Sequence, residues 1–219
     1  MPFLSGLDPA TLISRIIVLV IAFTIHELAH ALTADYFGDD TPRLNGRLTL
    51  NPLAHLDPMG SLLLLVAGFG WAKPVPVNPY ALQRRSSSAL MLVSLAGPMS
   101  NLLMAIVGAI PLRLRLVSLT DAFTSKGFFP TPGQVLFEFV WINLLLMLFN
   151  LIPLAPLDGE KIAEYFFPPA LARTWDTIRP YGPVILLVLI FVVPFVLHID
   201  VLGIIIGPPM QALFRLLVG

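Results

Sequence analysis

An apolar segment from Leu12 to about Ala34 constrains this chain more than any other feature, because it is long enough to cross a membrane as a helix. Asp8 and Pro9 precede it as an N-cap and first-turn pair. The whole chain is 57% hydrophobic and 12% charged, whereas about 25% of the residues of a soluble domain are charged. We therefore expect lipid to surround most of it.

Further apolar segments follow along the chain, and they differ in length. Met59 to Trp71 is short and broken by Gly68 and Gly70, so we expect a re-entrant segment there. A short surface helix with Trp175 as an interfacial anchor is expected over 169–179. The other apolar segments are 89–110, 133–151, 184–197 and 201–218, the last interrupted at 207–209.

Two polar stretches between these segments carry signals of extended structure. Arg43 to Leu50 places Asn45-Gly46 between short alternating runs, which favours a β-hairpin. Trp71 to Pro79 holds three closely spaced prolines and should be an edge strand or a loop. The sequence thus predicts an all-α integral membrane protein with about five to six transmembrane helices, a re-entrant segment and a short membrane-associated β-hairpin or strand.

Composition also excludes several classes of function. The 13 Lys and Arg residues balance the 13 Asp and Glu residues, and no basic run with interleaved aromatic residues indicates a nucleic-acid site. Cysteine is absent, which excludes disulfides, thiol catalysis and thiolate metal sites. Histidine and carboxylate side chains remain as the strong metal ligands available.

The first apolar segment contains His26-Glu-Leu-Ala-His30, a match to HExxH. Histidines at i and i+4 share one helix face, so both can reach one zinc ion, and Glu27 can act as the general base. Glu27 would lie about two-thirds of the way across the bilayer, where an unpaired charge costs at least ~2.5 kcal/mol. A bound metal would compensate that cost. The alternative is a polar patch that packs helices together.

Zinc in a catalytic site needs a third protein ligand, with the fourth position left for water. Asp158 is the best candidate, because the prolines before it suppress regular helix and let the chain bend back toward the first helix. The competing interpretation is that Asp158 caps the helix that follows. The residues alone leave both interpretations open.

Four motifs together resemble the site-2 protease family of intramembrane zinc metalloproteases. They are His26-Glu-Leu-Ala-His30, Asn51-Pro-Leu-Ala-His-Leu-Asp-Pro-Met-Gly60, Gly97-Pro-Met-Ser-Asn101 and Asn150-Leu-Ile-Pro-Leu-Ala-Pro-Leu-Asp-Gly159. The resemblance implies a zinc endopeptidase of regulated intramembrane proteolysis with one Zn²⁺ per chain, held by His26, His30 and Asp158. It also implies a membrane-protein substrate with a transmembrane segment. The chain has no room for the PDZ insertion or CBS tail of many relatives, so we expect a compact form.

Other polar residues in the apolar segments should point away from lipid. The resemblance suggests that Asn101 and Asn150 support the substrate or a developing oxyanion, whereas interhelical hydrogen bonding is the alternative. For Asn143 we favour packing. We treat residues 1–219 as one polytopic domain, with a catalytic core over about 8–160 and accessory helices over about 165–219.

A shared metal also constrains the topology. The ends of the first and third long helices must lie on one side of the membrane, so only an odd number of crossings fits between them. The loops on that side carry more Lys and Arg, which places the active site toward the cytoplasm in the cell membrane. The alternative function is a non-catalytic metal-binding scaffold or metal carrier, and the presence of Glu27, a base with no ligand duty, argues against it.

Overall fold

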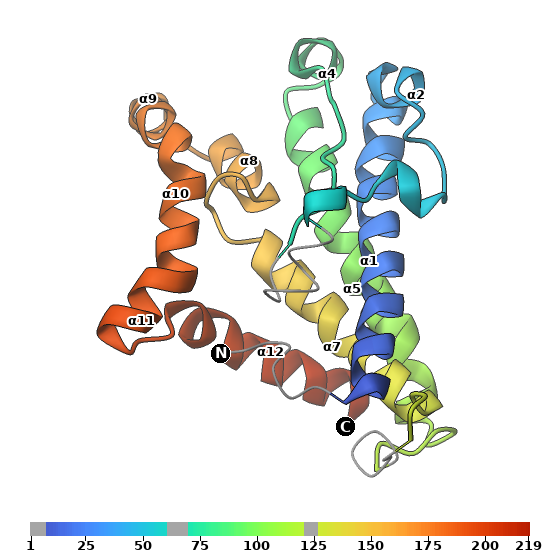
Figure 1. Cartoon of the computed structure of the whole chain (residues 1–219). Helices are drawn as coiled ribbons and strands as arrows, with labels where there is room; N and C mark the ends of the chain where they lie inside the picture. Colours follow the sequence, from blue (N-terminus) through green and yellow to red (C-terminus); the bar gives the residue numbers. More distant parts are fainter. Residues whose placement is uncertain (1–7, 61–69, 121–126) are drawn as a thin grey trace.

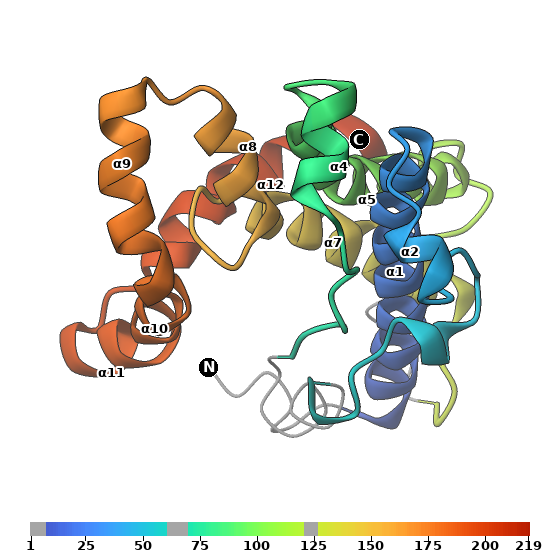
Figure 2. The same ribbon diagram turned by 90° about the horizontal axis from the view of Figure 1, so that it is seen from above.

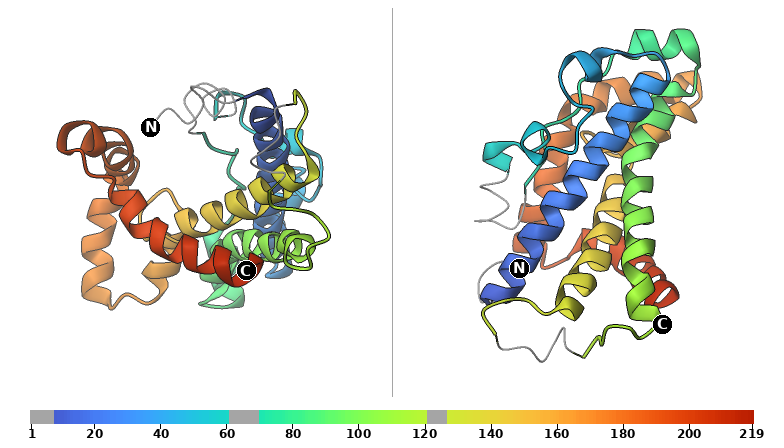
Figure 3. Two further views of the ribbon diagram at one scale, coloured as in Figure 1. Left: turned by 90° about the horizontal axis from the view of Figure 1, so that it is seen from below. Right: turned by 90° about the vertical axis from the view of Figure 1, so that its right-hand side faces the viewer.

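The structure is a computed structural model that describes residues 8–60, 70–120 and 127–219. Three long helices form its centre: α1 (Pro9–Tyr36), α5 (Ala89–Arg113) and α7 (Pro132–Asn150). They lie side by side, with α1 and α7 running in one direction and α5 in the other (Figures 1 and 3). The C-terminal ends of α1 and α7 therefore lie toward the same end of the bundle.

The starts of α1 and α7 follow capping signals in the sequence. Asp8 accepts a hydrogen bond from the backbone N–H of Thr11 at 3.1 Å, and Thr131 accepts one from Gln134 at 3.2 Å. Both bonds satisfy N–H groups that have no partner within the helix. Apolar contacts then hold the bundle together: Val18 and Leu19 of α1 pack with Ile142 of α7.

The remaining helices follow Asn150 and form an arm beside the bundle. Figure 1 shows α10 and α11 standing apart from α1, and Figure 2 shows α9 turned away from the direction of α10. Ile206 and Met210 of α12 pack against α5 and α7 at Ala105 and Leu144. The elements of this arm are α8 (Asp158–Tyr165), α9 (Pro169–Ile178), a 3₁₀ turn (Arg179–Tyr181), α10 (Gly182–Leu187), a π turn (Val188–Val192), α11 (Val193–Leu197) and α12 (Val201–Val218).

Five helical stretches in the described ranges are long and apolar enough to cross a membrane. They are Pro9–Tyr36, Ala89–Arg113, Pro132–Asn150, Pro169–Leu197 and Val201–Val218. The predicted surface helix over 169–179 thus continues into an apolar stretch. The predicted interruption at 207–209 is wrong, because α12 runs through Pro208 and Pro209 without a break. Prolines are tolerated in membrane helices when the surroundings satisfy the freed carbonyl groups.

The predicted hairpin over Arg43 to Leu50 is also wrong. Residues Thr41–Leu44 form a short helix, α2, and Asn45-Gly46 ends it instead of turning a hairpin. Gly46 has φ +67°, and the N–H of Arg47 bonds the carbonyl of Pro42 at 2.9 Å, which is a Schellman helix end. An Asn-Gly pair supplies the left-handed residue that both structures need, so the sequence signal alone did not separate them.

The segment predicted to be extended, Trp71 to Pro79, has no helix as far as Asn78, and Pro79 begins the next helix. Buried charges hold the extended part at two points. The guanidinium of Arg47 donates to the carbonyls of Lys73 at 3.0 Å and Pro74 at 3.1 Å. The Asp39 carboxylate accepts from the N–H of Asn78 at 2.6 Å. A single antiparallel bridge joins Ala72 to Leu56. Residues 61–69 of the predicted re-entrant segment lie outside the described residues. The short helices η1 (Pro52–Ala54) and α4 (Pro79–Arg85) flank this region.

Candidate metal centre

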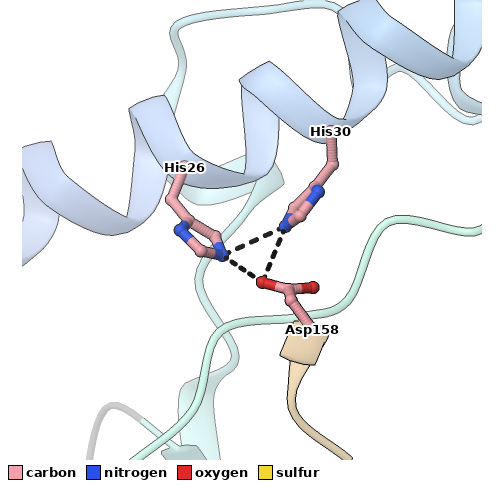
Figure 4. Close-up of side chains that lie close together, drawn as sticks. All are labelled: His26, His30 and Asp158. Carbon is pink, nitrogen blue, oxygen red and sulfur yellow. Dashed lines mark hydrogen bonds and ion pairs between the residues drawn. The ribbon is translucent and has the colours of Figure 1, made fainter. Parts of the chain in front are cut away.

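Two histidines one helical turn apart on α1 form the base of the site (Figure 4). His26 and His30 are both buried, and their Nε2 atoms lie 3.1 Å apart. The Nδ1 atom of His26 lies 2.6 Å from the side-chain oxygen of Asn101, and the Nδ1 atom of His30 lies 2.7 Å from the carbonyl of Val93. Both partners are acceptors, so each ring carries its proton on Nδ1 and turns an Nε2 lone pair to the same point.

Asp158 completes the group from the first turn of α8. Its Oδ2 atom lies 3.2 Å from His26 Nε2 and 3.3 Å from His30 Nε2. It does not cap α8, because the N-cap is Leu157 and no side-chain cap bond forms there.

The three facing atoms are all acceptors, which is the observation that fits a cation. Two imidazole lone pairs and a carboxylate oxygen repel one another unless a positive charge lies between them. Their separations of 3.1 to 3.3 Å match the spacing of about 3.3 Å that tetrahedral bonds of 2.0–2.1 Å give to ligand atoms around zinc. Asp158 Oδ2 is also buried without a hydrogen-bond partner. One residue set therefore offers three of the four positions around a zinc ion.

The α5 helix presents one stripe of residues to these histidines, and the motif Gly97-Pro-Met-Ser-Asn101 contained two of its three members. Val93, Gly97 and Asn101 recur every four residues and share one helix face. Val93 and Asn101 fix the two imidazoles, while Gly97 lies directly beneath them. The signal was present in the sequence as this spacing, but the partner of the stripe could be known only from the packing of α5 on α1.

Replacing Gly97 with alanine is expected to disrupt the centre. A Cβ atom at this position would lie 2.3 Å from His30 Nε2 and 2.6 Å from His26 Cε1. One ring must therefore leave its place, and we expect zinc affinity to fall by more than about 100-fold, the upper range for changes outside the ligand shell. Competition with a chromophoric chelator measures this affinity. Gly207→Ala is the control, because a Cβ there meets nothing within 4 Å. Unchanged affinity of Gly97→Ala would contradict the arrangement.

A cavity of about 360 Å³ opens beside the three ligands. Glu27 and Asn150 line it together with His26, His30 and Asp158, and the extended segment contributes Trp71, Val75 and Val77. Glu27 is buried, and no hydrogen bond or ion pair joins its carboxylate to another of the described residues. A carboxylate without a structural partner, one residue from a ligand, is placed to exchange protons with a molecule in the cavity.

The two candidate support residues lie in different places. Asn150, at the end of α7, lines the cavity and donates from Nδ2 to the carbonyl of Leu146 at 3.0 Å. Asn101 is fully buried and bonds His26 and Asn143 instead, so it touches a ligand rather than the open side of the centre. Asn150 therefore stays a candidate for contact with substrate, and Asn101 holds the His26 ring.

Comparison with known proteins finds several relatives. The chain is 47% identical over 183 residues to the "Putative zinc metalloprotease YwhC" of Bacillus subtilis, covering 82% of this chain and 80% of that protein. It is 32% identical over 178 residues to the "Putative zinc metalloprotease Rip2" of Mycolicibacterium smegmatis, covering 78% of this chain and 64% of that protein. The Mycobacterium tuberculosis H37Rv protein of the same name is 30% identical over 173 residues. No family model and no solved structure matches the chain.

Proposed function

The chain belongs to the site-2 protease family of zinc metalloproteases, and on that premise we propose that it is an intramembrane endopeptidase. It hydrolyses a peptide bond in or near a transmembrane segment of another membrane protein, as in regulated intramembrane proteolysis. One observation supports this most: the three converging acceptors and the buried carboxylate of Glu27 line one cavity, and three of these four residues lie on a helix that is long and apolar enough to span a membrane.

Each residue of the centre has a role in this proposal. His26, His30 and Asp158 hold one zinc ion, which when bound acidifies a water molecule and polarises the carbonyl of the substrate. Glu27 accepts the proton of the attacking water and then donates a proton to the leaving amine. Asn150 hydrogen-bonds the substrate from the end of α7, in a cavity lined mainly by apolar groups.

The substrate must become extended before it can be cut, because a helix keeps its carbonyl groups in internal hydrogen bonds. An extended chain in this setting needs new partners for its backbone. We propose that residues 75–77 supply them as an added strand. Arg47 holds the segment at Lys73 and Pro74, and Asp39 holds it at Asn78, so the residues between them are kept extended along the cavity.

A pair of substitutions at Val75 tests this strand. Val75→Pro removes the backbone N–H that would bond the substrate, whereas Val75→Ala shortens the side chain and keeps the N–H. We expect Val75→Pro to cut a single-span substrate at least about tenfold more slowly. The reason is that each backbone group left without a hydrogen bond in lipid costs several kcal/mol. Val75→Ala should stay near the wild-type rate. Zinc content should be equal in both, and equal rates in both would refute the added strand.

The same proposal predicts which substrates are cut fastest. A transmembrane segment with Gly or Pro near the scissile bond unwinds at lower cost than an uninterrupted leucine-rich helix. We expect the interrupted segment to be cleaved faster by the purified protein in liposomes. If a soluble, unstructured peptide is cleaved as fast as either segment, the protein is a metalloprotease that does not require a membrane substrate.

We further propose that the protein lies in the cell membrane with its metal centre toward the cytoplasm. This rests on the larger number of Lys and Arg residues in the loops at the metal end of the bundle. Arg84 of α4 and Arg115 after α5 lie at opposite ends of α5 and are both exposed. Single cysteines replacing them should label from opposite sides in intact cells, with Arg84→Cys protected from an impermeant reagent. Protection of Arg115→Cys instead would reverse the orientation.

A further inference from the structure

We infer that Asn143 of α7 fixes the metal-facing nitrogen of His26, as a positioning residue that acts through Asn101. Three hydrogen bonds join the residues in series. His26 Nδ1 lies 2.6 Å from Asn101 Oδ1, Asn101 Nδ2 donates to Asn143 Oδ1 at 2.9 Å, and Asn143 Nδ2 donates to the carbonyl of Phe139 at 2.8 Å. Asn101 and Asn143 are both fully buried, so water does not compete for these bonds.

The far end of the series sets its direction. The carbonyl of Phe139 can only accept, so Asn143 must turn its NH₂ group to it and its oxygen to Asn101. Asn101 must then donate to Asn143, which leaves its own oxygen for His26. An oxygen facing Nδ1 places the ring proton there, and the Nε2 lone pair of His26 consequently points to Asp158 and His30.

The two histidines differ in how firmly the partner of Nδ1 fixes the position of the ring proton. His30 Nδ1 faces the backbone carbonyl of Val93, which cannot turn around and can only accept. His26 Nδ1 faces an amide whose oxygen and nitrogen exchange places when the side chain rotates by half a turn. A rotated Asn101 would offer NH₂ to His26 and favour the ring with its proton on Nε2, which cannot bind a metal there. Asn143 prevents that rotation.

The test is the zinc affinity of the purified full chain, measured by chelator competition. Asn143→Leu frees the Asn101 amide to rotate, and we expect affinity to fall about tenfold, the lower end of the range for changes around metal ligands. The absorption spectrum of the Co²⁺-loaded protein should change as well, because the His26 ligand is displaced. Both readouts need metal binding but no proteolysis, so they stand apart from the proposed activity.

Gln134→Leu is the matched control. Gln134 is another buried amide of α7, and its Nε2 donates to Thr11 of α1 at 2.7 Å, so its loss also removes a hydrogen bond between helices. The side-chain hydrogen bond of Gln134 goes to Thr11, which is not part of the metal centre. We expect wild-type zinc affinity and an unchanged Co²⁺ spectrum. Equal losses in Asn143→Leu and Gln134→Leu would mean that Asn143 only packs the bundle, and wild-type affinity of Asn143→Leu would overturn the inference directly.

Asn101→Asp should make Asn143 unnecessary. Both oxygens of the introduced carboxylate accept, so the His26 Nδ1–H is held whichever way the side chain turns. Adding Asn143→Leu to Asn101→Asp should therefore cost no zinc affinity, although Asn143→Leu alone costs about tenfold. If the effects of Asn101→Asp and Asn143→Leu are additive, the role of Asn143 is structural alone.

Discussion

The Glu27→Gln variant is expected to keep its zinc and lose nearly all peptide hydrolysis. Glutamine has almost the shape of glutamate but cannot accept a proton from water at neutral pH. Glu27 is not one of the three converging acceptors, so the metal has no reason to leave. General base catalysis contributes about 10²- to 10⁴-fold to a rate, and we expect kcat to fall within or beyond that range.

The matched comparison is Glu27→Asp, which keeps the carboxylate but draws it back by one methylene. Its kcat should lie between those of the wild type and Glu27→Gln, because geometry is impaired while the base remains. All three proteins should carry equal zinc. If Glu27→Gln turns over substrate at more than about a tenth of the wild-type rate, another group is the base. If it loses zinc, Glu27 belongs to the ligand set.

The Asp158→Ala variant should show the opposite pattern and lose the metal. Only His26 and His30 would then face the ion, whereas catalytic zinc sites use three protein ligands. We expect zinc affinity to fall by more than about 100-fold, since changes to residues outside the ligand shell already cost 10–100-fold. Activity should disappear at low zinc concentration and return in part when zinc is in large excess.

Asp176→Asn provides the control for charge. Asp176 lies in α9 with its side chain 62% exposed. The substitution therefore removes one acidic group without touching the centre. Its zinc affinity should match the wild type. Wild-type zinc affinity in Asp158→Ala would show that a different residue is the third ligand. Glu160 is poorly placed for that role, because Arg179 and Trp175 already donate to its carboxylate.

The sequence predicted those parts of the site that local periodicity determines. A spacing of four residues places His26 and His30 on one helix face, and an apolar segment of sufficient length gives α1 with little ambiguity. The capping residue Asp8 likewise located the start of α1 to within a few residues. Each of these signals depends on neighbours within one or two helical turns.

The remaining features depend on contacts between distant segments. Whether Asp158 would cap a helix or face the histidines was open until the bend after α7 was known. Asn101 could support the substrate or form an interhelical hydrogen bond, and only the packing of α5 on α1 decides that it reaches His26. The Asn45-Gly46 pair was misread because a hairpin turn and a helix end need the same left-handed backbone.

Titrating zinc into the metal-free protein while following cleavage of a single-span substrate tests the central claim most directly. The claim is that one zinc ion, held by His26, His30 and Asp158, makes this chain a protease. The metal-free protein should be inactive, and activity should rise in proportion to added zinc until it saturates at one equivalent per chain. Cleavage by the metal-free protein, or no cleavage after one equivalent has bound, would contradict it.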